Sequence, residues 1–145
     1  MSTTTLLKPG PAYMDFMEFV MLMKHQVFEC AAHHGLTGMQ ALALCILNKP
    51  RPMNYFGKVF NCDPSNITGI VDGIEQKGLV ERFEDPLDRR IKMVKLCPGG
   101  DKIRLALLRE LFGPKSLILR KLSPTEVVSF TKLMNKITYG ELAFI

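Results

Sequence analysis

The sequence predicts a mainly helical fold that carries one small β-hairpin, an α+β fold formed by a single domain of 145 residues. Three observations predict it. Apolar residues recur at spacings of three and four over most of the chain. This spacing changes between residues 79 and 96, where two short strand-like runs flank a charged turn. A hydrophobic content of 47% and a charged content of 23% are typical of a globular protein with its own core.

Composition and charge limit the classes of function. The longest apolar run, Ala41 to Leu47, is too short to span a bilayer, and residues 1–11 lack the pattern of a secretory signal. We therefore expect a cytoplasmic protein without a membrane partner. The net charge of +5 permits nucleic-acid binding without demonstrating it, because a solvated basic surface gives the same value.

A long amphipathic helix is predicted from Tyr13 to about His33, a stretch without Pro or Gly. Its apolar side is wide enough to contact two surfaces, and the second is expected to belong to another copy of the chain. The residues of this side are Phe16, Val20, Met23, Val27 and Cys30, with Met17, Met21 and Phe28 beside them.

Three short helices are predicted next. Thr37 and Gln40 form a capping box for a helix that runs to about Asn48, and a second helix spans residues 53–60 and stops at Asn61. Asp63 at the N-cap and Pro64 at the first position begin the third, which ends at Gly78. Its buried stripe is expected to consist of Ile67, Ile70, Val71 and Ile74.

The last part of the chain is predicted to be helical. Helical spacing returns at Pro98, is interrupted at Gly113 and Pro114, and resumes as far as Leu122, which indicates a kinked or broken long helix. A capping box at residues 123–126 then begins a final helix that carries apolar residues to Ile137.

The order helix, turn, helix, hairpin is the order of a winged helix-turn-helix, a fold that reads duplex DNA. The second helix of such a unit enters the major groove, while the hairpin contacts phosphates or the minor groove. The face opposite the apolar stripe carries short polar side chains and two glycines. These are Ser65, Asn66, Thr68, Gly69, Asp72, Gly73 and Gln76.

Two residue types on this face raise specific expectations. Glycine inside a helix costs about 1 kcal/mol relative to alanine, so Gly69 and Gly73 indicate a close approach, either of DNA or of a neighbouring protein segment. Asp72 would be repelled by phosphate, and we expect it to pair with a basic side chain, Arg82 or Arg90.

The residues from Asp63 to Arg82, read DPSNITGIVDGIEQKGLVER, resemble the recognition helix and first wing strand of the MarR (multiple antibiotic resistance regulator) family. The tip Asp85 to Arg90, DPLDRR, and the segment KLCPGG that ends at Gly100 resemble the wing of the same family and its exit into the next helix. The resemblance covers about 40 contiguous residues, and the order of helices extends it over nearly the whole chain.

This resemblance implies a sequence-specific, DNA-binding transcription regulator, a ligand-responsive repressor of bacterial or archaeal origin and not an enzyme. It implies a DNA-binding lobe at residues 36–97 and a homodimer held by residues 11–35 and 98–145. Two recognition helices would lie about one turn of DNA apart on a pseudo-palindromic operator. Arg90 would enter the minor groove, with Asp88 holding it and Arg89 on phosphate.

Two departures from the family pattern bear on function. Gly69 and Gly73 stand where family members often carry a long polar side chain, so we expect few direct contacts from this helix to base edges. Ser65, Asn66 and Thr68 remain as contacts, the first at the positive helix N-terminus. Cys97 replaces a capping Thr, which weakens the start of the helix at Pro98.

The family's usual small phenolic or anionic effector suggests a pocket near the first helix, for which Tyr13, Met17, His33 and Met39 are the candidates. Cys30 with His33 and His34 is a weaker candidate for a reactive thiol or a metal site, because residues three and four apart share a helical face. We expect no cofactor, no metal and no catalytic motif. The cysteines, Cys30, Cys45, Cys62 and Cys97, lack a CxxC pair and are expected to be buried apolar residues.

Two other functions stay open on the sequence alone. A winged helix can serve as a protein-interaction module, which the acidic residues of the recognition helix mildly favour. It can also bind DNA without strong specificity, as an architectural protein. The wing distinguishes DNA binding from protein interaction, because an interaction module has no need of Asp88, Arg89 and Arg90 at a hairpin tip.

Overall fold

The structure is a computed structural model that describes residues 11–138, and these form the mainly helical fold with a small sheet that the sequence predicts. Along the chain the elements are α1 (Pro11–His33), α2 (Gly38–Ile46), β1 (Arg51–Pro52), α3 (Met53–Phe60), α4 (Pro64–Gln76), β2 (Val80–Glu84), β3 (Lys92–Leu96), α5 (Pro98–Phe112), a 3₁₀ turn (Leu119–Lys121) and α6 (Pro124–Thr138).

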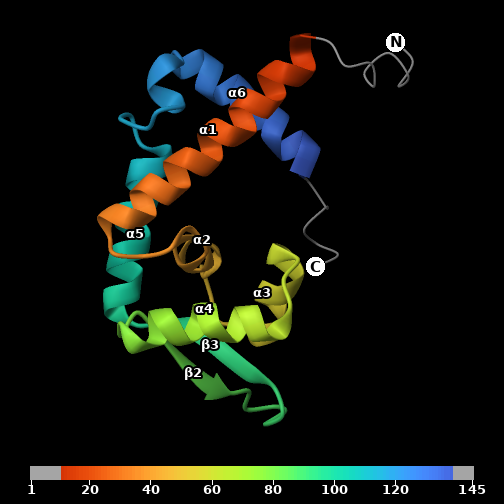
Figure 1. The fold of residues 1–145 in the computed structure, drawn as a ribbon, viewed down its shortest axis with the longest axis vertical. Helices are drawn as coiled ribbons and strands as arrows, with labels where there is room; N and C mark the ends of the chain where they lie inside the picture. Colours follow the sequence, from red (N-terminus) through yellow and green to blue (C-terminus); the bar gives the residue numbers. More distant parts are fainter. Residues whose placement is uncertain (1–10, 139–145) are drawn as a thin grey trace, which may run out of the picture.

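The elements gather at two ends of an elongated molecule (Figure 1). Helices α2, α3 and α4 and the sheet form one end, from which the hairpin of β2 and β3 projects. Helices α1 and α6 cross at the other end, and α5 joins the two. Phe19 of α1 and Phe130 of α6 pack edge to face at this crossing, with ring centroids 5.8 Å apart. The hairpin tip therefore lies far from the crossing of α1 and α6.

Local signals in the sequence place most helix ends correctly. Thr37 and Gln40 make both hydrogen bonds of the predicted capping box, and Ser123 and Glu126 do the same before α6. Asn61 adopts the left-handed conformation with φ of 49° and ends α3, and Gly78 with φ of 70° follows α4. Neither Asp63 nor Cys97, the N-cap residues of α4 and α5, makes a side-chain capping bond, so these two helices start on their prolines alone.

The sheet has three strands, in the order β1–β3–β2, where the sequence predicts a two-stranded hairpin. The extra strand is Arg51–Pro52, which pairs with Val94 and Met93 of β3. Two residues are too few to show the alternation that marks a strand, and Pro52 removes one donor. The main pairing, from Val80 opposite Leu96 to Glu84 opposite Lys92, is that of the predicted hairpin.

The long helix that begins at Pro98 is broken rather than kinked. It ends at Phe112 because Gly113 is extended, with ψ of 175°, as expected for the residue before a proline. The segment after Pro114 does not return to an α-helix at Leu117, as the spacing suggests, and forms turns and a short 3₁₀ turn instead. Buried Ser116 holds this segment by accepting a hydrogen bond from the backbone N–H of Leu119, at 2.9 Å.

The core lies between α2, α4, the sheet and the near halves of α1 and α5. Its side chains include Leu44, Leu47, Phe56, Ile67, Val71, Ile74, Val80, Val94 and Leu107, each at most 2% exposed. The predicted stripe of α4 is therefore correct for Ile67, Val71 and Ile74, while Ile70 is only half-buried. This core fixes the face that α4 turns outward.

Helix α1 contributes to the core only through its second half. Cys30 and Ala31 are buried, and the Gln26 amide donates to the carbonyl oxygens of Glu110 and Leu111 of α5, both at 3.2 Å. Two members of its predicted apolar side, Phe16 and Val20, are 63% and 38% exposed, so they take no part in this core. No helix within residues 11–138 is both long and apolar enough to cross a membrane.

Gly100→Ala should destabilise the protein, whereas Gly69→Ala should not. A methyl group at Gly100 would overlap the carbonyl oxygen of Leu79, which is fixed by the hydrogen bond it accepts from Cys97 N–H at 2.9 Å. The expected loss is about 1–3 kcal/mol. A methyl group at Gly69 meets nothing within 4 Å and should add about 0.5–1 kcal/mol. Urea unfolding measures both, and equal effects would contradict the packing described here.

Candidate nucleic-acid interface

Helix α4 turns a polar face away from the core. The exposed residues of its first two turns are Pro64, Ser65, Asn66, Thr68 and Gly69. These residues face away from the core because the apolar stripe of Ile67, Val71 and Ile74, on the other side of the helix, packs against it. The free N–H groups at the start of the helix lie beside Ser65 and Asn66, and such a helix N-terminus attracts anions.

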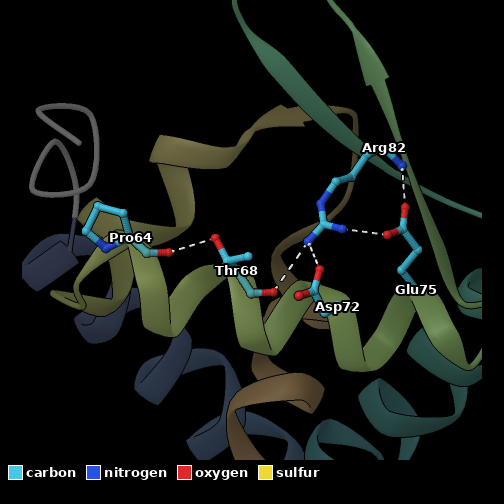
Figure 2. A network of polar contacts seen from close by, with 5 residues as sticks. All are labelled: Pro64, Thr68, Asp72, Glu75 and Arg82. Atoms are coloured by element: carbon cyan, nitrogen blue, oxygen red, sulfur yellow. Dashed lines mark hydrogen bonds and ion pairs between the residues drawn. The ribbon is translucent and has the colours of Figure 1, made fainter.

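Arg82 of β2 ties the wing to α4 by four hydrogen bonds (Figure 2). Its guanidinium lies 2.5 Å from Asp72 Oδ1 and 2.5 Å from Glu75 Oε2, and it donates to the carbonyl oxygen of Thr68 at 3.4 Å. The backbone N–H of Arg82 donates to Glu75 Oε1 at 3.1 Å. A planar guanidinium with several donors can hold two carboxylates and a carbonyl at once, which a lysine cannot do.

This arrangement offsets part of the negative charge on the acidic side of α4. The sequence predicts that Asp72 pairs with Arg82 or Arg90, and the structure gives Arg82. Glu75 is a second partner that the sequence analysis missed. Its spacing of three from Asp72 places it on the same side of the helix, but only the path of the chain through Gly78 brings Arg82 over both. Asp72 is thus a positioning residue for the wing, and we do not retain it as a direct DNA contact.

The two glycines of α4 have different surroundings. A methyl group at Gly73 would overlap the side-chain amide of Gln40, the capping residue of α2, whereas Gly69 faces open space. The close approach at Gly73 is therefore that of a neighbouring protein segment, the second of the two alternatives left open by the sequence. Gly73 is withdrawn from the expected DNA-binding residues. Gly69 is exposed and remains among them.

Thr68 has only part of its hydrogen-bonding capacity free. Its hydroxyl donates to the carbonyl oxygen of Pro64 at 3.0 Å, one turn back in the helix (Figure 2). The hydroxyl oxygen can still accept a bond, and the methyl group can contact a thymine methyl. Asn66 and Ser65 carry the remaining donors on this part of the helix.

The hairpin tip is closed by hydrogen bonds of its own. Asp88 accepts from the backbone N–H of Arg90 at 3.0 Å and from Arg90 Nε at 3.2 Å. The contact between Asp88 and Arg90 that the family resemblance implies is present, and the Arg90 side chain is 92% exposed. Arg89 is exposed beside it, and Lys92 pairs with Glu84 at 2.8 Å at the base of the tip. The tip thus presents two arginines to the solvent.

A groove of about 510 Å³ joins α4 to the wing. It lies between the start of α3, the middle of α4 and the second half of the hairpin. Its walls are formed by Pro52, Met53, Asn54, Thr68, Asp72, Arg82, Arg90, Ile91 and Lys92. Asn54 at the start of α3 and Lys92 of the wing were not singled out from the sequence, because neither belongs to the recognition helix or to the tip.

The four residues expected to line an effector pocket do not meet within one chain. Tyr13 and His33 lie twenty residues apart on α1, which at the rise of a helix separates them by about 30 Å. Tyr13 is exposed, and Met39 belongs to α2. His33 alone of the four lines one of the cavities described here, a hollow of about 350 Å³ between α1 and the end of α5 that also contains Cys30, Glu110 and Lys115.

Cys30 is not an activated thiol. Burial, and then the negative charge of Glu110, raise the pKa of Cys30 to about 11, so it is protonated near neutral pH. The histidines that were candidates to activate it contact Glu110 instead, His34 at 2.8 Å and His33 at 3.3 Å. Burial opposes ionisation of Glu110, but hydrogen bonds from these histidines outweigh it and lower the pKa of Glu110. No cluster of metal ligands is found among residues 11–138.

Comparison with known proteins agrees with this geometry. The model of the MarR family matches residues 36–92. A relative in Bacillus subtilis, an uncharacterized HTH-type transcriptional regulator called YsmB, is 29% identical over 79 residues, which are 52% of this chain. The match spans about half of that relative, 51% of its length.

Solved structures extend the likeness to nearly the whole fold. MarR from E. coli in its apo form superposes with a TM-score of 0.70 at 22% identity, covering 90% of this chain and 98% of that one. A mutant of the same protein complexed with operator DNA gives 0.64 at 22%, covering 94% and 99%. CouR from Rhodococcus jostii RHA1, bound to p-coumaroyl-CoA, gives 0.70 at 20%, covering 90% and 93%.

The order of helices and the three-stranded sheet define a winged helix-turn-helix fold. Through residues 36–92 the chain is similar to the MarR family, which agrees with the resemblance seen in the sequence. The helix-turn-helix and the wing lie within this matched segment.

Arg82→Ala should lower the free energy of unfolding by about 1–2 kcal/mol, because it leaves two half-exposed carboxylates side by side on α4 without a partner. Lys92→Ala is the control, since its ion pair with Glu84 is about half exposed on both sides and is worth about 0–1 kcal/mol. Urea unfolding at low and at high salt measures both. A loss for Arg82→Ala no larger than for Lys92→Ala would contradict the role given to Arg82.

Proposed function

We propose that this protein is a transcription regulator that binds a pseudo-palindromic duplex DNA site as a homodimer. Helix α4 lies in the major groove, with Ser65, Asn66, Thr68 and Gly69 toward the bases and phosphates. The wing follows the backbone into the adjacent minor groove, where Arg90 enters and Arg89 contacts phosphate. A major groove about 12 Å wide admits a helix, and a minor groove about 6 Å wide admits a single side chain of a hairpin tip.

One observation carries this proposal: Arg90 and Lys92 of the wing line one groove with Thr68 of α4, and the acids beside them are paired with basic side chains. Asp72 and Glu75 bind Arg82, Asp88 contacts Arg90, and Glu84 contacts Lys92. Without these pairs the carboxylates of α4 would repel a phosphate backbone. A structural neighbour, a mutant of E. coli MarR, is complexed with operator DNA, which supports DNA binding by this chain.

The homodimer is supported by the apolar surface that the single chain leaves exposed. Along α6, Leu133, Met134 and Ile137 are 60%, 39% and 74% exposed, and they recur at spacings that form one face of the helix. Tyr13, Met14, Phe16 and Met21 are exposed on α1, which crosses α6 (Figure 1). Exposed apolar side chains gathered on two crossing helices support a protein interface. The expected dimerisation region also includes residues 139–145, which lie outside the described residues.

We also propose that a small phenolic or anionic effector regulates this protein and releases it from a promoter that it represses. CouR, a structural neighbour, is bound to p-coumaroyl-CoA, which supports ligand binding on this fold. In this chain the hollow that contains His33 and Lys115 lies between α1 and α5, the helices that join the two ends of the molecule. A ligand there can change the spacing of the two DNA-binding ends.

Arg90→Ala should weaken binding to the best duplex selected from random DNA by about tenfold at moderate salt. It should also reduce the slope of log affinity against log salt by about one, because one phosphate-neutralising cation is lost. Fluorescence anisotropy over a salt series measures both quantities. Arg120→Ala, an exposed arginine of the 3₁₀ turn Leu119–Lys121, outside α4 and the wing, is the matched control and should leave both unchanged.

The same titration separates the alternatives. Equal affinity for random and selected duplexes would favour an architectural protein. No duplex binding by the wild type at low salt would contradict the proposed function and favour a protein-interaction module.

The double variant Leu133→Asp with Ile137→Asp should convert the protein to a monomer. Both side chains are exposed in the single chain, so the charges should not unfold it, whereas two carboxylates cannot be buried unpaired between copies. Analytical ultracentrifugation measures the mass, and circular dichroism checks that the helices persist. A dimer of unchanged stability in the folded variant would contradict an interface at α6.

A further inference from the structure

Leu87, at the tip of the wing, is a side chain that the proposed function does not yet use. It is 97% exposed, more than any other large hydrophobic residue that the structure describes as exposed. Ordinary exposed apolar side chains rest partly on their neighbours, as Ile91 of the same hairpin does at 40%. Leu87 has almost no contact with its own chain, and a partner that removes it from water therefore gains the full effect of its burial.

The tip that carries Leu87 is held in one shape. Asp85 accepts a hydrogen bond from the backbone N–H of Leu87 at 2.8 Å, and its own N–H donates to the carbonyl oxygen of Ile91 at 3.0 Å. The N–H of Ile91 donates to the carbonyl oxygen of Asp88 at 2.9 Å. The ring of Pro86, the residue before Leu87, fixes its own backbone angle φ. The loop therefore cannot easily fold back to cover this side chain.

The charges around Leu87 restrict what it can contact. Arg89 and Arg90 are exposed on the same tip, and the acids nearby are engaged, Asp88 with Arg90 and Glu84 with Lys92. The tip thus combines one apolar side chain with two exposed arginines, of which Arg90 is paired with Asp88. A matching surface has a narrow apolar floor between anionic rims, which describes the minor groove of duplex DNA, with its sugar walls between two rows of phosphates.

We propose that Leu87 inserts into the minor groove beside Arg90 and gives the protein a preference for A·T over G·C pairs at the positions that the wing covers. In the minor groove a G·C pair differs from an A·T pair by the N2 amino group of guanine, a hydrogen-bond donor. Leu87 has no acceptor for that donor and would remove it from water unpaired. Against an A·T pair the same side chain buries no new donor.

This proposal rests on the proposed function, because it takes the wing to lie on DNA. The groove described above favours DNA over a lipid surface or a protein partner, since Arg90 and Ile91 of the wing border it together with Thr68 of the recognition helix. A ligand that engages the polar face of α4 therefore also meets the tip.

The test uses the best duplex selected from random DNA, with the pairs flanking its two major-groove half-sites changed in turn to A·T, G·C and inosine·C. Inosine·C has the major-groove groups of G·C but lacks the N2 amino group. The wild type should bind the A·T and inosine·C duplexes equally and the G·C duplex about tenfold more weakly at one or more flanking positions. Fluorescence anisotropy at one salt concentration gives the ratios.

The variants assign this preference to Leu87. Leu87→Ala should reduce the tenfold ratio to about twofold or less with an unchanged salt slope, since no cation is lost. Leu87→Met, which stays apolar, should retain the ratio. Leu87→Asn, which offers an acceptor to the guanine amino group, should bring the G·C duplex level with the others. Thermal unfolding should be the same for all of them, because Leu87 packs against nothing.

A tenfold ratio that persists in Leu87→Ala would overturn the inference and assign the preference to Arg90 and the width of the groove. A wild type that does not discriminate among the three duplexes would overturn it as well, and so would Leu87-dependent binding to phosphatidylglycerol vesicles in place of DNA. Failure of the wild type to bind any duplex would instead be the failure of the proposed function.

Discussion

The orientation of the wing relative to the recognition helix depends on Arg82. This side chain leaves the first wing strand and binds two carboxylates and a backbone carbonyl of α4, so that helix and hairpin behave as one body. The core alone does not give this constraint, because it holds the wing by Val80 and Val94 near the base of the hairpin. The same contacts offset part of the negative charge that would otherwise keep α4 from a phosphate backbone. One interaction therefore serves both the geometry and the electrostatics of the interface.

Most of the fold could be predicted because its signals are local. The capping residues Thr37 and Ser123, the left-handed residue Asn61 and the apolar stripe of α4 each act within about four residues, and all of them do in the structure what the sequence indicates. The features that were missed depend on distant neighbours. The strand at Arg51 exists only because β3 lies beside it. Periodicity predicts that the apolar side of α1 contacts two surfaces but does not say which of its residues face the core, and Phe16 and Val20 are exposed.

The interface was predicted less completely than the fold, for a similar reason. The charge of Asp72 was enough to expect a basic partner, but Glu75 and the fit of Gln40 against Gly73 follow from how the chain turns at Gly78 and from how α2 packs on α4. The expected effector pocket stays a prediction, because residues at opposite ends of a long helix cannot line one cavity in a single chain and the structure describes only one chain. The hydrogen bonds of Glu110 likewise show why two histidines after Cys30 do not make it reactive.

The proposed roles of α4 and the wing in binding DNA differ because the exposed face of α4 lacks long polar side chains. Ser65, Asn66 and Thr68 are short, Gly69 has no side chain, and the Thr68 hydroxyl already donates within the helix. Few base edges are therefore within reach of donors from the major groove, and a long side chain at Gly69 would be needed to supply more. The wing has what the helix lacks, two exposed arginines and a leucine on a closed loop. Because Arg82 fixes the wing to the helix, a site that suits one groove but not the other cannot be accommodated by moving the hairpin alone.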